Sequence, residues 1–328
     1  MPITRTYYKV HRVFPDPDYL YLENTYAGDN TLTITKTGTP TSTDLSYSLD
    51  KNTWTDIYNG GTVTVPQGGK VYLRSTTGMA AGASNNYTIS MSQTHTVGGH
   101  IASLIDYSNI SSINTIPSYA FYGLFKNDTN LTNTTVDFSG ITTIQQRGCS
   151  SMFYGCTNMT GDADLSDVIS IETNGCTEMY YQTKITSCDL TNLTTLGDGA
   201  LGSNIRYFNY GAFAECSHLT TIIGFNKLTT VGDSGLGRAF YNCTSLITGA
   251  DLSNVTVTTG DTNFAQMYLN CQSLNLAVSP NLNTWNTSLF NNWLSGVAAT
   301  GVVRKPAGLT ITADSASGVP TGWTTEDY

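Results

Sequence analysis

The residues of this 328-residue sequence that could do chemistry are its seven cysteines, and four of them stand in one recurring pattern. The stretches "MFYGC" (152–156), "AFAEC" (212–216), "AFYNC" (239–243) and "MYLNC" (267–271) each place an aromatic residue three positions before a cysteine. A thiol can serve as a nucleophile, a metal ligand or half of a disulfide. The odd count favours buried free thiols over a disulfide framework, and no CxxC pair offers the ligand spacing of a zinc site.

Other catalytic signatures are missing from the sequence. It contains no G-x-S-x-G, no H-E-x-x-H and no phosphate-binding loop, and its four histidines are scattered. "GDADLSD" (161–167) holds three aspartates, but it lies at the turn into a repeated strand, which disfavours a calcium loop. We therefore predict that the protein is not an enzyme and that it holds no cofactor and no metal. The net charge of −9 and the pI near 4.7 disfavour a nucleic-acid partner.

The aromatic residue of the pattern recurs at a nearly constant interval. Successive copies are separated by 28, 27, 33, 27 and 28 residues. They are Phe125, Phe153, Tyr180, Phe213, Phe240 and Tyr268. Three positions later comes a cysteine, or Asp128 or Thr183 in the other two copies, and an apolar residue usually follows after three more. This spacing predicts a short helical or 3₁₀ turn with one face packed inward, so the cysteine is a small buried apolar residue rather than a reactive one.

The other half of each unit has its own pattern of apolar residues at three-residue intervals. "VDFSGITTI" (136–144), "ADLSDVISI" (163–171), "CDLTNLTTL" (188–196), "IGFNKLTTV" (223–231) and "ADLSNVTV" (250–257) superpose directly. One short strand and one helical turn in about 27 residues is the plan of a leucine-rich repeat, in which stacked units bury one continuous core.

The combined phrasing, "MFxGCxxLT" followed by "ADLSxVxxI", resembles the BspA-type leucine-rich repeats. That family is found in surface proteins of gut bacteria and in virion fibre or decoration proteins of gut bacteriophages such as crAss-like phages. The resemblance covers roughly residues 99–328 and implies a right-handed solenoid, closed by a C-terminal cap at about 285–328. The cap residues that match the family are Trp293, Gly296, Val297, Gly318, Pro320 and Trp323.

The first third of the chain reads differently. Residues 21–98 contain short runs of alternating apolar and polar residues separated by Gly-, Asn- and Asp-rich breaks, which predicts an immunoglobulin-like β-sandwich. Residues 1–20 include "FPDPD", whose prolines discourage regular structure, so we expect an extended arm there, with a docking role or as a disordered tail. The fold class is therefore mainly β, a sandwich followed by a solenoid.

One unit is about six residues longer than the others, within "GDGALGSNIRYFNYGAF" (197–213). Insertions in repeat arrays lie on one face, which is often the binding face, and Tyr and Arg are enriched at interfaces. The alternative is an apolar patch that closes over a wider turn. The candidate ligand-binding residues are Tyr180, Tyr181, Arg206, Tyr207, Phe208 and Tyr210.

The function expected from these features is structural or adhesive. The sequence lacks an apolar segment typical of a signal peptide or a membrane span, so we expect a chain made in the host cytoplasm and carried in a virion as a head fibre, tail fibre or decoration protein. Its N-terminal region would attach to capsid or tail proteins, and its solenoid would bind a host-surface or mucosal glycan or protein. We also expect a homo-oligomer, either a dimer or a trimer. The alternative is an adhesin on a bacterial cell surface.

Overall fold

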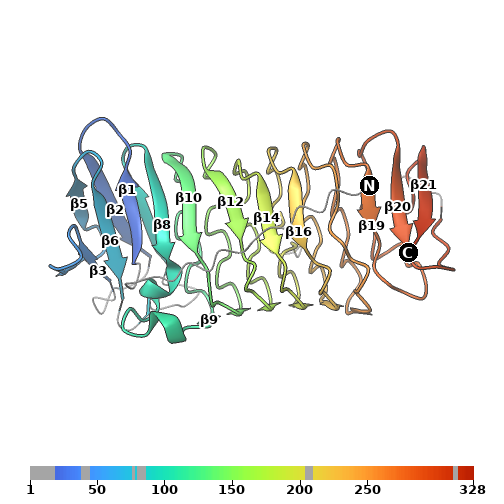
Figure 1. Ribbon diagram of the computed structural model, residues 1–328, viewed down its shortest axis with the longest axis horizontal. Coiled ribbons are helices and arrows are strands. Elements are labelled where there is room, and N and C mark those ends of the chain that lie inside the picture. Colours follow the sequence, from blue (N-terminus) through green and yellow to red (C-terminus); the bar gives the residue numbers. More distant parts are fainter. Residues whose placement is uncertain (1–18, 38–44, 76–77, 80–85, 204–209, 313–316) are drawn as a thin grey trace, which may run out of the picture.

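The chain forms an elongated stack of β-strands (Figure 1). The computed structural model describes residues 19–37, 45–75, 78–79, 86–203, 210–312 and 317–328, so most of the predicted arm lies outside the described residues. No helix in these ranges is both long and apolar enough to cross a membrane.

Two sheets at one end of the stack share a core. In spatial order, the first sheet contains β8 (His95–His100), β1 (Leu20–Asn24), β6 (Lys70–Arg74), β3 (Ser46–Ser48) and β4 (Thr55–Asp56). The second contains β5 (Thr62–Val65), β2 (Asn30–Lys36) and β7 (Tyr87–Met91). Alternate residues are buried along β1, β2 and β7, as the period of two predicts. The immunoglobulin-like topology and the right-handed coil stay predictions.

The first sheet continues into the repeats without a break. β8 pairs antiparallel with β1 on one side and parallel with β10 (Leu131–Asp137) on the other. Two 3₁₀ helices, η1 (Ile101–Leu104) and η2 (Ile110–Ser112), follow β8. The two regions therefore share one nine-stranded sheet and one hydrophobic core.

Parallel strands make two sides of the repeat region. The first sheet adds β12 (Thr160–Asp164), β14 (Ser187–Leu190) and β16 (Thr221–Gly224) after β10. The second side contains β9 (Thr115–Ile116), β11 (Thr143–Ile144), β13 (Ser170–Ile171), β15 (Thr195–Leu196), β17 (Thr230–Val231) and β18 (Val257–Thr258). At the far end, a separate three-stranded parallel sheet contains β19 (Leu276–Val278), β20 (Gly301–Lys305) and β21 (Trp323–Asp327).

The third side is a ribbon of turns, and here the prediction of short helical turns was wrong. In the second repeat, alternate N–H groups donate to the carbonyl three residues back, as from Met152 to Cys149. The N–H groups between them donate to the next repeat, as from Phe153 to Met179. Every fourth residue has a positive φ, including Arg147 (55°) and Ser151 (54°). A helix cannot form because half of the donors pair with the neighbouring repeat and a positive φ interrupts the helical backbone.

The aromatic residues of the pattern stack in a row behind this ribbon. Neighbouring ring centroids in the row from Phe125 to Tyr268 lie 5.3–5.7 Å apart, and every ring is at most 2% exposed. Each of the four patterned cysteines donates its Sγ–H to the carbonyl of the aromatic residue one repeat earlier, as Cys243 does to Phe213 at 3.1 Å. The repeated spacing therefore reflects packing, as the sequence predicted.

We predict that the stack tolerates a hydroxyl at Tyr268 because Gly249 leaves room for it. A Cβ at position 249 would lie 2.9 Å from the hydroxyl oxygen, which accepts a hydrogen bond from Ala250. Gly249→Ala should lower the free energy of unfolding by about 2 kcal/mol. Adding Tyr268→Phe should recover part of that loss in urea unfolding, whereas two simply additive losses would contradict the prediction.

Candidate functional site

The thiols are placed for packing rather than for reaction. All seven cysteines are free and fully buried. Burial raises the pKa of Cys216 and of Cys271 to about 12, and it raises the pKa of Cys149, Cys188 and Cys243 well above the ordinary value. Since the thiolate is the nucleophile and the metal ligand, these groups are inert near neutral pH.

We predict that no cysteine of the folded protein reacts with a thiol reagent at pH 8, and that all seven react after unfolding. Unfolded thiols ionise at about pH 8.5, below the raised pKa values of Cys149, Cys188, Cys216, Cys243 and Cys271 in the folded chain. The folded state therefore loses stability as the pH rises from about 8.5 toward 12, because the unfolded chain releases those protons first. Titration with a chromogenic disulfide and unfolding curves across that pH range check both statements. Rapid labelling of the native protein would contradict them.

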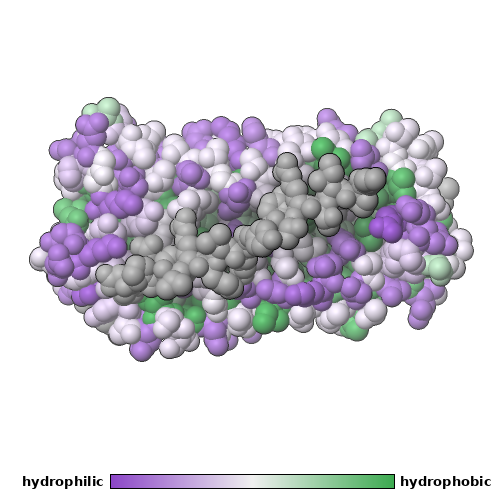
Figure 2. Space-filling model, in the orientation of Figure 1, coloured by the Kyte–Doolittle hydropathy of each residue, from purple (hydrophilic) through white to green (hydrophobic). Residues whose placement is uncertain are grey.

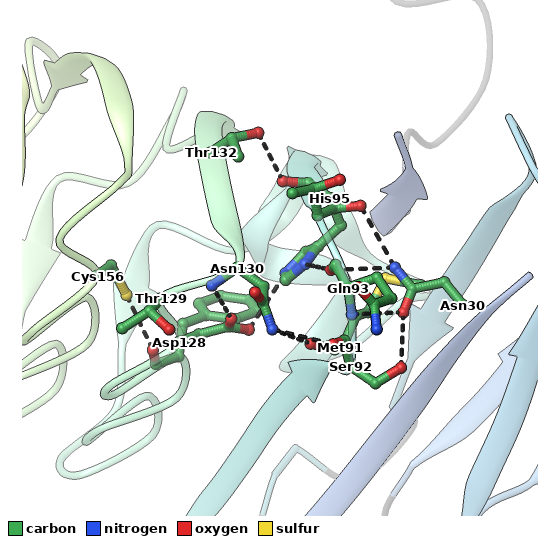
Figure 3. A network of polar contacts seen from close by, with 12 residues as sticks. Asn30, Met91, Ser92, Gln93, His95, Asp128, Thr129, Asn130, Thr132 and Cys156 are labelled. Carbon is green, nitrogen blue, oxygen red and sulfur yellow. Dashed lines mark hydrogen bonds and ion pairs between the residues drawn. The ribbon is translucent and has the colours of Figure 1, made fainter. Parts of the chain in front are cut away.

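A buried polar cluster lies where the first two sheets meet the first repeat (Figure 3). Nε2 of His95 is 3.2 Å from Oδ2 of Asp128, neither atom has another hydrogen-bond partner, and the two side chains are 0% and 2% exposed. Nδ1 of His95 contacts the carbonyl of Gln93 at 3.0 Å. Cys156 holds the position equivalent to Asp128 in the next repeat, and it donates its Sγ–H to the Phe125 carbonyl.

The cluster joins two parts of the fold. Asn30 from β2 donates to the carbonyls of Gln93 and Thr94, while Asn130 from the first repeat donates to the carbonyls of Met91 and Ser92. His95, Asp128 and Cys156 stand close together, but the Asp128 carboxyl lies between the imidazole and the thiol. Burial also raises the pKa of the Cys156 thiol. A nucleophile needs a base beside it and access to substrate, so this cluster is structural.

We predict that Asp128→Cys destabilises the protein although cysteine is the commonest residue of that column. It would leave His95 buried with an unpaired ring nitrogen, at a cost of about 3 kcal/mol. Thr183→Cys introduces the same residue at the same position of the third repeat, and it should shift the free energy of unfolding by about 1 kcal/mol or less. Urea unfolding compares the two variants, and an Asp128→Cys protein as stable as the parent would contradict the prediction.

The candidate ligand-binding residues divide into three groups. Tyr180 belongs to the buried stack between Phe153 and Phe213, which corrects its expected place on the surface. Tyr181 and Tyr210 stack on one another with centroids 4.3 Å apart. Arg206, Tyr207 and Phe208 lie outside the described residues.

Tyr181 and Tyr210 belong to a second aromatic row, which we call the tyrosine row: Tyr154, Tyr181, Tyr210 and Tyr241. Successive ring centroids are 4.8, 4.3 and 6.1 Å apart. The row follows the outer side of the turn ribbon, where Tyr154, Tyr210 and Tyr241 are half-buried and Tyr181 is buried. The Lys126 ammonium lies 4.4 Å from the Tyr154 ring centroid and covers one end.

The insertion completes this row. Backbone hydrogen bonds align Tyr180 with Phe213, so the ribbon position that matches Tyr181 in the fourth repeat is Ala214. Alanine there would leave a gap between Tyr181 and Tyr241, and Tyr210 from the insertion occupies it. The chain rejoins the ribbon at Ala212, whose N–H donates to the Leu201 carbonyl. The predicted insertion thus contributes one ring to a surface that spans four repeats.

Acidic and amide groups border the row. Gln182 donates to the Glu215 carboxylate at 2.8 Å, and Ser151 donates to the Glu178 carboxylate at 3.1 Å. Burial, hydrogen bonds to Tyr210 and Glu215, and the Glu215 charge raise the pKa of Tyr181. Burial and the nearby acidic groups also raise the pKa of Tyr154. The Tyr154 and Tyr181 phenols are therefore neutral at physiological pH and can both donate and accept hydrogen bonds.

The row limits which contacts a ligand can make. Most ring faces are covered by a neighbouring ring, so a ligand meets ring edges, hydroxyls and the flanking side chains. Large apolar side chains are exposed only at separate places among the described residues, and Figure 2 shows one face on which hydrophilic residues predominate. In the same described ranges, no group of three or more His, Cys, Asp or Glu side chains is placed to hold a metal ion.

Sequence reasoning missed a third aromatic group, on the outer face of the first sheet. Arg74 contacts the rings of Trp54 and Tyr107, against which Tyr19 packs, and Lys70 lies over Tyr21. The alternation of "YLYLEN" and "KVYLR" would have placed Tyr21, Lys70 and Arg74 on one face. Trp54 and Tyr107 come from connecting segments, and no periodicity predicts where those side chains lie.

Comparison with known families identifies part of the repeat region. Residues 200–297 match the family described as "BspA type Leucine rich repeat region (6 copies)". This segment is similar to those repeats. The match supports the BspA-like reading of the pattern, over a segment that includes the tyrosine-row members Tyr210 and Tyr241.

Two further comparisons add little. A crystal structure of a leucine-rich repeat protein from Bacteroides ovatus ATCC 8483 is 14% identical, with a TM-score of 0.23, and the match covers 72% of this chain and 73% of that one. No curated protein matches the chain.

Proposed function

We propose that this chain is a non-enzymatic adhesive protein that binds a glycan or protein surface through the tyrosine row. The observation that carries the proposal is Tyr210, which an insertion brings into the gap left by Ala214 and so keeps the row continuous. Stacked rings that are already held in place lose little conformational freedom on binding, and tyrosine contributes both apolar area and a hydrogen-bonding hydroxyl.

The proposed setting is a phage virion, in which the chain is a fibre or decoration protein. The N-terminal region would attach to a capsid or tail protein, and the repeats would meet host-surface or mucosal glycan or protein. A dimer or trimer on each of many virion copies would multiply weak contacts into firm attachment. The alternative setting is a bacterial cell surface, because the repeat family that the sequence resembles occurs in both settings.

Mass spectrometry distinguishes the two settings. Purified virions and bacterial outer-membrane fractions would be digested and searched for peptides of this chain. Enrichment with intact virions supports the phage setting. Enrichment in the outer-membrane fraction, with none in virions, contradicts it and favours the cellular adhesin.

We predict that Tyr210→Ala combined with Tyr241→Ala weakens binding to immobilised mucin by about tenfold or more, since interface tyrosines often contribute more than 1 kcal/mol each. Biolayer interferometry on the purified chain measures the loss. Tyr58→Ala is the matched control, because Tyr58 is a single tyrosine, 63% exposed, on the two-sheet region.

Thermal melting must show that all three proteins are equally folded. Equal loss in the Tyr58 variant, or unchanged binding in the double variant, would contradict the role of the tyrosine row. Absence of mucin binding by the parent protein would overturn the mucosal-glycan form of the proposal.

A further inference from the structure

Arg74 stands between two aromatic rings on the outer face of the first sheet. It is the last residue of β6, and its guanidinium carbon lies 3.9 Å from the ring centroid of Trp54 and 4.1 Å from that of Tyr107. Tyr19 packs against both rings, with its ring centroid 4.8 Å from that of Trp54 and 6.4 Å from that of Tyr107. All four side chains are partly exposed.

This arrangement leaves the hydrogen-bonding edge of the guanidinium unused. The N–H donors of arginine lie in the plane of the group, whereas cation–π contacts use its faces. Within the described ranges, Arg74 makes no ion pair and no hydrogen bond through its side chain. The rings therefore fix the orientation of a charged fork without neutralising it.

Nearby carboxylates are engaged elsewhere. Asp106, next to Tyr107 in sequence, accepts hydrogen bonds from Ser108 and Asn109 through both of its carboxyl oxygens. Asp56 accepts from Ser46, which pairs with Arg74 across β3 and β6. Neither acidic side chain forms an ion pair with the guanidinium, so the charge of Arg74 is available to a group from outside the chain.

Two further cations lie on the same face of the sheet. The Lys70 ammonium is 3.9 Å from the Tyr21 ring centroid and 3.3 Å from a Glu23 carboxylate oxygen. The Lys51 ammonium is 4.9 Å from the Tyr72 ring centroid. Three cations and several rings thus lie on one face of the first sheet, in a protein with a net charge of −9. Because Glu23 neutralises Lys70, the guanidinium of Arg74 is the charge that would attract a carboxylate here, with apolar ring area beside it.

We propose that Arg74, with Trp54 and Tyr107, is the centre of a docking site for an acidic segment of a partner protein. An Asp or Glu carboxylate would accept two parallel hydrogen bonds from the guanidinium edge, while its neighbours pack on the outer ring faces. A protein is favoured over a saccharide because Trp, Tyr and Arg are the residues that most often dominate binding energy at protein interfaces. This site is distinct from the tyrosine row, so either can fail without the other.

The test uses the indole signals of the four tryptophans in the full chain, labelled with nitrogen-15. The Trp54 indole donates to the Lys51 carbonyl beside the proposed site, while Trp285, Trp293 and Trp323 donate to carbonyls at the far end of the molecule. An acetylated hexaglutamate peptide is the probe, and hexaglutamine is its neutral counterpart. We expect hexaglutamate to shift the Trp54 signal alone, and hexaglutamine to shift none.

Three variants distinguish carboxylate binding by the planar guanidinium of Arg74 from general attraction to positive charge. Arg74→Gln should abolish the shift, and Arg74→Lys should weaken the binding about tenfold because an ammonium cannot replace the planar fork. Lys227→Gln removes the same charge from an exposed side chain that donates to Asn192, and it should leave the titration unchanged. The dispersion of the amide spectrum shows whether each variant is folded.

Several outcomes would overturn the proposal. A Trp54 shift that persists in Arg74→Gln, or that Lys227→Gln also removes, would show general charge attraction. A shift with a hexauronate saccharide but not with hexaglutamate would assign the site to an acidic glycan instead. Absence of any shift with either probe, in a folded parent protein, would show that the guanidinium edge is not a carboxylate site.

Discussion

Backbone hydrogen bonds from each repeat to the next are the interactions on which the rest of this structure depends. In the turn ribbon, every second N–H group donates to the neighbouring repeat. Each of the two strands of a repeat likewise pairs in parallel with the equivalent strand of the next repeat. A repeat without its neighbour would leave these donors without a protein partner and its apolar face exposed to water. The stack therefore forms as a series of neighbours, each of which completes the one before it.

This constraint explains why equivalent residues recur in columns. An aromatic ring in one repeat must pack on the ring of the next at the spacing that the backbone hydrogen bonds impose, and the centroid distances vary by only a few tenths of an ångström. A repeat position holds a different residue where its neighbour in the stack is not an ordinary repeat. Asp128 occupies a cysteine position because its neighbour is His95 rather than another repeat, and Ala214 stands where a second ring, Tyr210, arrives from the insertion.

The sequence was most informative where packing repeats. It predicted the buried cysteines and an inward-packed turn, because both depend on a period that a single chain displays, but it did not predict that the aromatic rings stack. It was misleading about the turns, since a residue three positions after the aromatic suits a helix and a turn ribbon equally well. The distinguishing signal was the Gly or Asn that directly precedes three of the patterned cysteines. Gly155, Asn242 and Asn270 all have a positive φ. Elsewhere Arg147 and Glu178 take the same conformation, at a strain of about 1–2 kcal/mol that inter-repeat hydrogen bonds offset.

Recognition, by contrast, requires groups that the stack does not use for itself. Most polar atoms of a repeat are committed to a neighbour, so the groups left for a partner lie at irregular places, such as the insertion and the sheet that precedes the first repeat. The tyrosine row and Arg74 are two such places, and they differ in chemistry. The row offers neutral hydroxyls and ring edges, whereas Arg74 offers a charge that two rings hold in a fixed plane. One continuous core joins the two regions, so both surfaces are fixed in orientation before any partner arrives.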